Sequence, residues 1–153
     1  MSEDKEIDYD SILEKLEKEL SVSEKKWNEI IEKLSGRINC ELKKSIDLSA
    51  EATAYRQMLI DERTTFFFKM YKDMPKLKKL RKKHFEFYST KYPIKVNSTE
   101  KTKLIDSDVC WHECKMDYLQ NHINFLSDSI KTVDQVLYSI KNKVDLYNAT
   151  GLD

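Results

Sequence analysis

The feature that most constrains the fold is a long series of apolar residues toward the C-terminal end, spaced alternately by three and four positions. From Ile105 the series continues for about five heptads, with His112 at the one polar position. Its further members are Val109, Met116, Leu119, Ile123, Leu126, Ile130, Val133, Leu137, Ile140, Val144 and Tyr147. This spacing predicts a coiled-coil helix, and we expect the ten residues from Val109 to Val144 to carry oligomerisation. A helix over 107–148 is roughly 60 Å long, more than we expect the rest of one chain to cover.

A second apolar stripe accompanies this seam. Trp111, Tyr118 and Phe125 recur at seven-residue spacing, so they share a helix face that a two-stranded seam does not require. Two apolar faces indicate a helix with two neighbours, as in a multi-helix bundle or a ring of subunits. Alternatively, the second face packs on a helix over 49–73 of the same chain.

Composition favours helices throughout. Only two glycines and two prolines occur in 153 residues, whereas 35% of the residues are charged, a balance that suits exposed helices and leaves few turns for a β-rich fold. The length allows one domain or one elongated subunit. We therefore predict an all-α chain of several amphipathic helices, ending in the coiled-coil-like helix and assembling into a homo-oligomeric ring or bundle.

The first 48 residues are predicted to form an acidic helical arm, and residues 49–153 the core. One amphipathic helix is expected over 7–20, with Ser21 and Glu24 then forming a capping box that opens a second helix to about residue 42. Residues 1–35 carry eleven acids and six bases. The arm is a candidate surface for a protein partner.

Two further helices and a connector are expected in the middle of the chain. Asp47 or Ser49 can cap a helix that runs to the Met74–Pro75 step, and a basic helix follows over about 75–89. Residues 91–97 read as an extended connector, the one candidate for β or irregular structure.

No catalytic motif occurs, and we expect the chain not to be an enzyme. It has no GxxxxGK[ST], GxGxxG, HExxH or GxSxG sequence. Cys110, His112 and Cys114 lie close together, but a structural zinc site takes four ligands, usually as two pairs, and a second pair is lacking. We expect these cysteines to be buried in the core, and we predict no metal or cofactor.

The cysteine count and the N-terminal sequence indicate the compartment. Three irregularly spaced cysteines do not make a complete disulfide framework, and the acidic N-terminus lacks the order of a signal peptide. No stretch approaches ~18 uninterrupted apolar residues. We therefore expect a protein of the reducing cytoplasm without a membrane span.

A basic block followed by aromatic residues is the candidate binding site. Six cationic side chains fall in the eight positions 76–83, and residues 69–95 carry ten bases against two acids. Cationic side chains bind phosphates and aromatic rings stack on unpaired bases, so the mixture suits single-stranded nucleic acid. The predicted DNA-binding residues are Lys76, Lys78, Lys79, Arg81, Lys82, Lys83, His84, Tyr88, Lys91 and Tyr92. Phe85 and Phe87 are further stacking candidates, although most of these aromatic residues could equally be core.

Other readings of the same block stay open. It could be a solvated helix face, a membrane-surface patch or, in a eukaryote, a nuclear signal. The competing class of function is a non-enzymatic coiled-coil structural or adaptor protein that does not bind nucleic acid.

The order of these parts resembles UvsY, the recombination mediator family of T-even-type phages, over most of residues 45–151. The resemblance rests on Leu48-Ser49-Ala50-Glu51-Ala52, on Phe87-Tyr88-Ser89 after the basic helix, and on the entry into the last helix from Leu104 to Val109. The tail is the strongest match, with Tyr138-Ser139-Ile140-Lys141, Asp145-Leu146 and Ala149-Thr150-Gly151.

The resemblance implies a mediator that binds single-stranded DNA and promotes loading of a recombinase in place of the single-strand-binding protein. It implies a ring-like homo-oligomer of about six or seven subunits, assembled through the C-terminal helix, in the cytoplasm of an infected host cell. A Lys-x-Arg pair is associated with DNA binding in the family; Lys82 matches its first position, but His84 stands where arginine is expected. Arg81 and Lys83 could compensate.

Overall fold

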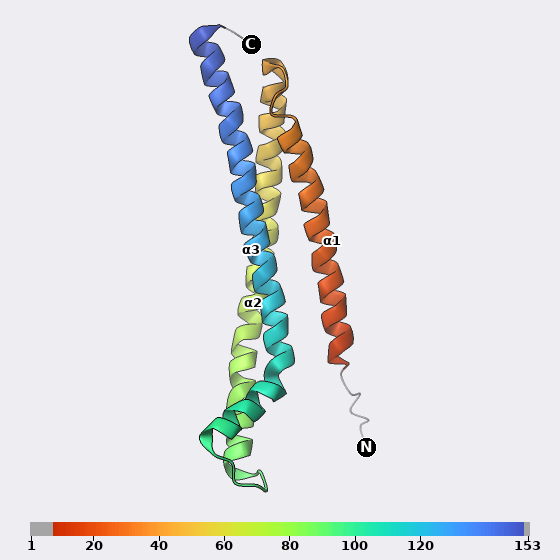
Figure 1. The fold of residues 1–153 in the computed structure, drawn as a ribbon, viewed down its shortest axis with the longest axis vertical. Helices are drawn as coiled ribbons and strands as arrows, with labels where there is room; N and C mark the ends of the chain where they lie inside the picture. Colours follow the sequence, from red (N-terminus) through yellow and green to blue (C-terminus); the bar gives the residue numbers. More distant parts are fainter. Residues whose placement is uncertain (1–7, 152–153) are drawn as a thin grey trace.

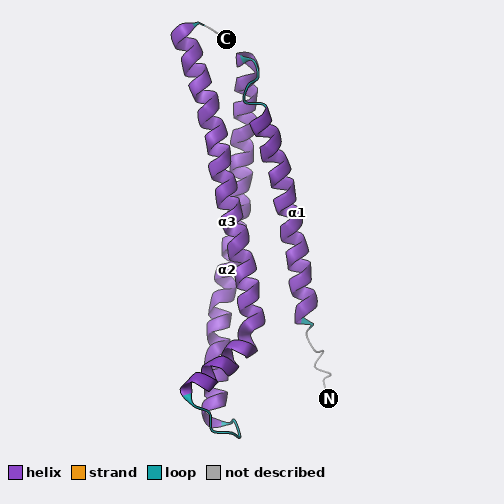
Figure 2. Ribbon diagram, in the orientation of Figure 1, coloured by secondary structure: helices purple, strands orange, loops and turns teal. Residues whose placement is uncertain are grey.

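The computed structural model describes residues 8–151 and consists of three long helices (Figure 1 and Figure 2). They are α1 (Tyr9–Gly36), α2 (Leu42–Thr90) and α3 (Ser98–Thr150). No strand occurs within 8–151. The predicted all-α fold is therefore confirmed, and the connector predicted at 91–97 is the loop between α2 and α3.

The three helices lie side by side in an elongated bundle. Helices α2 and α3 are antiparallel along their length, and α1 runs in the direction of α3 and packs mainly against it (Figure 1). The end of the bundle that contains the α2–α3 connector extends beyond the start of α1 (Figure 1). Within residues 8–151, that end, which carries the basic block, is therefore a two-helix hairpin that extends past the start of α1.

Helix α1 is continuous, so the break predicted at Ser21 is wrong. The helix is capped by Asp8, which accepts a hydrogen bond from the Ser11 backbone N–H. The predicted capping box of Ser21 and Glu24 does not form: Ser21 is an exposed residue inside the helix, and the Glu24 carboxylate lies 3.4 Å from Nδ1 of His122 on α3. Ser23 donates its hydroxyl to Glu62 of α2. The Ser23 and Glu24 side chains thus contact the other two helices and not backbone N–H groups of α1, so they do not start a new helix. Ile7, the predicted first residue, lies outside the described residues.

Helix α2 passes through Pro75, so the predicted boundary there is also wrong. An internal proline removes one backbone hydrogen bond and costs about 3 kcal/mol. Contacts on both sides offset this cost, because Met70 is buried before Pro75 and Arg81 pairs with α3 carboxylates after it. The start is earlier than the predicted cap at Asp47 or Ser49, since the helix begins at Leu42.

Helix α3 begins at Ser98, seven positions before Ile105, the first residue of the predicted seam. Asn97 provides a capping box: the Glu100 N–H donates to Asn97 Oδ1 at 2.8 Å, and the Asn97 N–H donates to Glu100 Oε2 at 3.0 Å. The helix ends where Gly151 adopts a left-handed conformation with φ 67°, which suits glycine.

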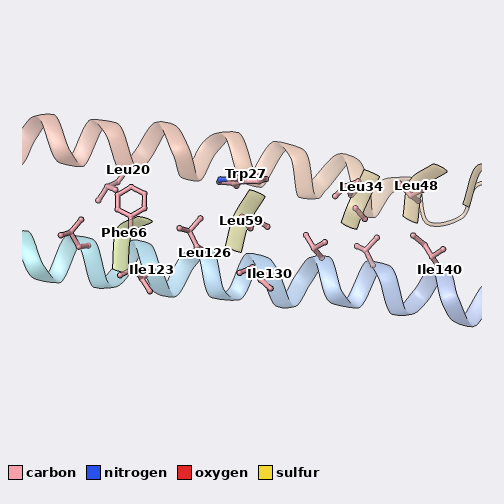
Figure 3. Close-up of a cluster of buried hydrophobic side chains, with 14 of the residues drawn as sticks. Leu20, Trp27, Leu34, Leu48, Leu59, Phe66, Ile123, Leu126, Ile130 and Ile140 are labelled. Carbon is pink, nitrogen blue, oxygen red and sulfur yellow. The ribbon is translucent and has the colours of Figure 1, made fainter. Parts of the chain in front are cut away.

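The core is a three-helix seam within one chain (Figure 3). Helix α1 contributes Leu20, Trp27 and Leu34, at seven-residue spacing, and α2 contributes Leu59 and Phe66 among others. Each fully buried large side chain stabilises the fold by about 1.5–3 kcal/mol. The acidic arm and the predicted core region 49–153 therefore share one hydrophobic core.

The seam of the last helix is filled by this core. Buried in the single chain are Val109, Leu119, Ile123, Leu126, Ile130, Val133 and Ile140, while Met116, Leu137 and Val144 are half-buried. The expectation that the rest of one chain is too short to cover the last helix is wrong. Because α2 does not stop at Pro75, its 49 residues match the 53 of α3. Oligomerisation through the seam stays a prediction.

The second apolar stripe faces α1. Trp111 donates its indole N–H to the Tyr9 carbonyl at 2.7 Å, with ring centroids 4.4 Å apart. Tyr118 and Phe125 pack against the core, and Glu17 of α1 raises the pKa of the Tyr118 hydroxyl through its charge. Helix α1 is therefore a neighbour of Trp111 and Tyr118.

Candidate nucleic-acid interface

The basic segment, defined as residues 76–92, forms the end of α2 and the first residues of the connector. It lies at the hairpin end of the bundle (Figure 1), where α3 is the neighbour of its last turns among the helices of 8–151. Leu77, Leu80, His84 and Tyr88 face inward and are half-buried. The remaining positions of α2 in this segment present their side chains to solvent, apart from Arg81.

Most of the predicted cationic residues are exposed. Lys78, Lys79, Lys83 and Lys91 form no ion pair with any residue in the described part of the chain. Among the cationic residues of the basic segment, these four lysines are therefore the ones whose charge is not offset by a carboxylate of 8–151.

Two other lysines of the segment have acidic neighbours on α2. Lys76 lies 3.2 Å from Asp73, which Lys115 of α3 also contacts at 2.7 Å, and Lys82 lies 3.9 Å from Glu86. Burial raises the pKa of Asp73, but hydrogen bonds from Lys115 and Lys76 outweigh it, so the pKa lies below its ordinary value. Exposed pairs of this kind are weak, and a phosphate can replace the carboxylate.

Arg81 is used differently from the lysines. Its guanidinium pairs with Glu113 and, at 3.0 Å, with Asp106, both on α3. Hydrogen bonding to Glu113 raises the pKa of Arg81. Arg81 therefore ties the end of α2 to α3, and a phosphate would have to compete with two carboxylates for it.

Asp108 organises the inner side of the segment. Its Oδ2 atom lies 3.1 Å from Nδ1 of His84 and accepts a hydrogen bond of 2.6 Å from the Tyr88 hydroxyl. That hydrogen bond raises the pKa of Tyr88 to about 12, so the phenol stays protonated. Asp108 fixes both side chains against α3.

The aromatic residues at the hairpin end form a cluster outside the core. The ring centroid of Tyr88 lies 5.0 Å from that of Tyr92 and 5.2 Å from that of Phe87. Phe85 is 54% exposed and Phe87 42% exposed, and the Lys101 ammonium lies 4.8 Å from the Phe85 ring centroid. None of the four rings is fully buried, so they are accessible to a ligand at least at their edges.

The hairpin brings further cations to the segment that the sequence reading missed. Lys101 on the first turns of α3 donates to the Ser89 hydroxyl at 2.9 Å, and Lys95 and Lys103 are exposed nearby in the chain. The signal was present in the sequence, because a connector of a few residues between two helices returns the chain along the same end. Asp108 lies within the segment from Leu104 to Val109 that resembles the family, but its contacts with His84 and Tyr88 are seen only in the structure.

Chain positions 110–114 show no arrangement for metal chemistry. Cys110 is exposed and Cys114 half-buried, so the expectation that they are buried in the core is wrong, because they lie beside and not within the seam. No group of three or more His, Cys, Asp or Glu side chains that could hold a metal ion occurs in the part of the chain that the structure describes. Burial lowers the pKa of His112.

A family comparison decides the relationship of the chain. The model of the family described as the recombination, repair and ssDNA binding protein UvsY matches residues 55–150, more than half of the chain. The chain belongs to the UvsY family. Searches of curated proteins and of solved structures gave no match.

The UvsY match includes all the predicted DNA-binding residues and the whole seam of the last helix, but it leaves α1 outside. Within the match, Lys82 is exposed, as a phosphate contact requires, whereas His84 is turned toward Asp108. The arginine expected at that position is replaced by a side chain held against α3. No helix within residues 8–151 is long and apolar enough to span a membrane.

Proposed function

We propose that this UvsY-family chain binds single-stranded DNA through the basic segment and acts as a recombination mediator. The observation that carries the proposal is the set of exposed lysines at the hairpin end, four of which have no carboxylate partner in 8–151. Lysines of this kind bind phosphates and release counterions. The family description, recombination, repair and ssDNA binding, supports the same ligand.

The preference for a single strand comes from the aromatic side chains. Phe85 and Phe87 expose ring area next to the lysines, and a ring stacks only on a base that is not already paired and stacked in a duplex. In this proposal the lysines hold the phosphates and the rings hold the bases. Arg81 and His84 act mainly by keeping α2 against α3 through Asp106 and Asp108.

We propose that the working form is a homo-oligomer, of about six or seven subunits by the family resemblance. Tyr138 and Leu146 support assembly through α3, because they are 66% and 63% exposed on the helix that carries the seam. Repetition of a weak basic segment around an oligomer raises the affinity for one strand steeply without any new type of contact.

The proposed partners follow from this activity. A mediator loads a recombinase onto a strand that a single-strand-binding protein covers, so both proteins are expected to contact the oligomer. The proposed place of action is the cytoplasm of a phage-infected cell. The acidic helix α1, which lies outside the family match, is a candidate surface for one of these proteins.

A loading assay tests the mediator step. A labelled single strand is covered with single-strand-binding protein, and recombinase filament formation is followed with and without this protein. We expect faster filament formation in its presence. A protein that binds the strand but leaves filament formation unchanged would be a DNA-binding protein without mediator activity.

One observation favours the alternative of a structural or adaptor coiled coil. Arg81 and His84 are paired with carboxylates of α3, as in a helix pair built only for packing. An adaptor of this kind would show no steep fall in affinity for DNA with salt. A salt titration therefore separates the two functions.

A further inference from the structure

Two exposed aromatic side chains lie on α2 just before the basic segment. Phe68 is 65% exposed and Tyr71 is 60% exposed, whereas their neighbours Phe66 and Met70 are buried in the core. The apolar pattern of the sequence explains Phe66 and Met70 and leaves Phe68 and Tyr71 without a role. Because they are three positions apart, the two exposed rings are neighbours on the helix surface and together form an apolar patch, which is a candidate contact with another molecule.

These rings share the outer face of α2 with lysines. Residues four, seven and eleven positions apart lie on one side of a helix. Phe68 is therefore on the same face as Lys72 and Lys79, and Tyr71 is on the same face as Lys78. All three lysines are exposed, and none forms an ion pair with a residue of 8–151. The two rings and the three lysines that follow them thus lie on a single surface.

The surface is continuous because α2 does not end at Pro75. The helix is continuous from Leu42 to Thr90, so Phe68 and Lys83 lie on the same helix. At ~1.5 Å per residue they are roughly 22 Å apart along its axis. A helix boundary at Pro75, as the sequence suggested, would have separated the rings from the basic segment.

The core holds the Tyr71 ring in place. Phe67 packs against the hydrophobic core, and its ring is stacked with that of Tyr71 at a centroid distance of 6.2 Å and an interplanar angle of 21°. A ring supported in this way loses little conformational freedom when a second ring stacks on it. Phe68, by contrast, has no ring contact among the described residues.

We propose that Phe68 and Tyr71 are base-stacking residues that extend the single-stranded DNA surface from the basic segment toward the middle of α2, with Lys72, Lys78 and Lys79, which follow the rings along the helix, binding phosphates. This inference rests on the proposed function and enlarges its site. Charge favours a nucleic acid: apolar patches at protein contacts are depleted of lysine, whereas here three exposed lysines share the helix face of the two rings.

Two matched double variants test the role of the rings. Phe68→Leu with Tyr71→Leu removes both rings but keeps apolar, helix-favouring side chains, and Phe68→Tyr with Tyr71→Phe keeps both rings. Each full-length variant is titrated into an oligonucleotide that contains 2-aminopurine, a base whose fluorescence falls when it stacks. Light scattering gives the mass of each protein.

We expect the leucine pair to bind the oligonucleotide at least about fivefold more weakly, with less quenching of 2-aminopurine. The ring-keeping pair should behave like wild type. The salt dependence should be the same for all three proteins, since no phosphate contact is removed.

Three results separate the possible failures. If wild type does not bind the oligonucleotide, the proposed function itself fails, and this inference with it. If wild type binds and the leucine pair binds and quenches equally well, only the stacking role is overturned. If the leucine pair loses mass in light scattering while the ring-keeping pair does not, the rings form a contact between chains, which also overturns it.

Discussion

Trp27 of α1 donates its indole N–H to Oε2 of Glu62 on α2 at 2.8 Å. The other oxygen of this carboxylate accepts the Ser23 hydroxyl and lies 3.6 Å from Nε2 of His122 on α3. His122 is fully buried, and its Nε2 atom forms no hydrogen bond with any residue of 8–151, since the 3.6 Å to Glu62 is too long for one. One half-buried carboxylate thus joins all three helices beside the hydrophobic core.

The Glu62 cluster should make the bundle sensitive to acid. Burial raises the pKa of Glu62, but hydrogen bonds from Ser23 and Trp27 and the charge of His122 outweigh it, so the folded-state pKa lies below the ordinary value. A carboxyl with a lowered pKa contributes stability above its unfolded pKa of about 4.3 and loses it as the pH falls through the folded pKa. Between pH 6 and pH 3, urea denaturation should show a larger loss of unfolding free energy for wild type than for Glu62→Gln.

At pH 7 the same variant should be less stable than wild type by about 1–3 kcal/mol, because Ser23 and Trp27 donate to different oxygens of the carboxylate and the glutamine places an NH2 group, which cannot accept, in one of these positions. Other carboxyls, such as Asp73, titrate in both proteins and cancel in the comparison. An equal loss of stability on acidification in the two proteins would show that Glu62 is not the acid-sensitive group.

Helix α1 should unfold together with α2 and α3. Leu34 is buried at 1% exposure in the shared core, so Leu34→Ala should lower the unfolding free energy by about 2–5 kcal/mol in a single transition. Val22→Ala is the matched control on the same helix, since Val22 is 70% exposed and its truncation should change stability by less than about 0.5 kcal/mol. A separate early transition in the Leu34 variant would identify residues 1–48 as an independent arm.

The sequence predicted the helical class, the connector and the residues of the seam, because periodicity reports which face of a helix is buried. It misplaced the helix boundaries at Ser21 and Pro75, because there a local signal is outweighed by contacts between distant residues. The last helix starts before the seam because a local capping box at Asn97 and Glu100 opens it. Ser23 binds a residue 39 positions away, and Glu24 contacts one 98 positions away. Such partners have no local signature.

The partner of the seam could not be predicted for a related reason. A heptad pattern shows that Leu126 and Val133 are buried, but it is the same whether the facing helix belongs to the same chain or to another. In the single chain the facing helix is α2, which is long enough because it continues through Pro75. The sequence predicted a helix boundary at Pro75 and therefore a shorter helix. The exposure of Phe68 and Cys110 likewise followed only from where the other helices lie.

Arg81 should contribute more to stability than to DNA affinity. Arg81→Gln removes the ion pairs to Asp106 and Glu113, so we expect the unfolding free energy to fall by about 1 kcal/mol, as for half-exposed pairs. Lys79→Gln removes the same charge without breaking an ion pair to a residue of 8–151, and it should weaken DNA binding more. If Arg81→Gln weakens DNA binding as much as Lys79→Gln, the guanidinium leaves its carboxylates to bind phosphate.

Assembly is best tested at exposed positions of α3. Ile130→Asp would place a charge in the core of the single chain, where Ile130 is 6% exposed, and would unfold it. Tyr138→Asp with Leu146→Asp changes only exposed side chains. Light scattering should show a folded protein of lower mass, with greatly weakened DNA binding because multivalency is lost. A variant of unchanged mass would show that the outer face of α3 is not the contact.

The central claim, that the basic segment binds single-stranded DNA, is tested most directly by fluorescence anisotropy of a labelled single strand at two salt concentrations. Wild type is compared with Lys79→Glu/Lys83→Glu and with Lys25→Glu/Lys26→Glu, an equal charge change on α1. We predict tight, salt-sensitive binding by wild type and the α1 variant. For Lys79→Glu/Lys83→Glu we predict much weaker binding, with the salt slope reduced by about 1.4 for two lost phosphate contacts per chain. Equal binding by all three proteins, or none by wild type, would contradict the account.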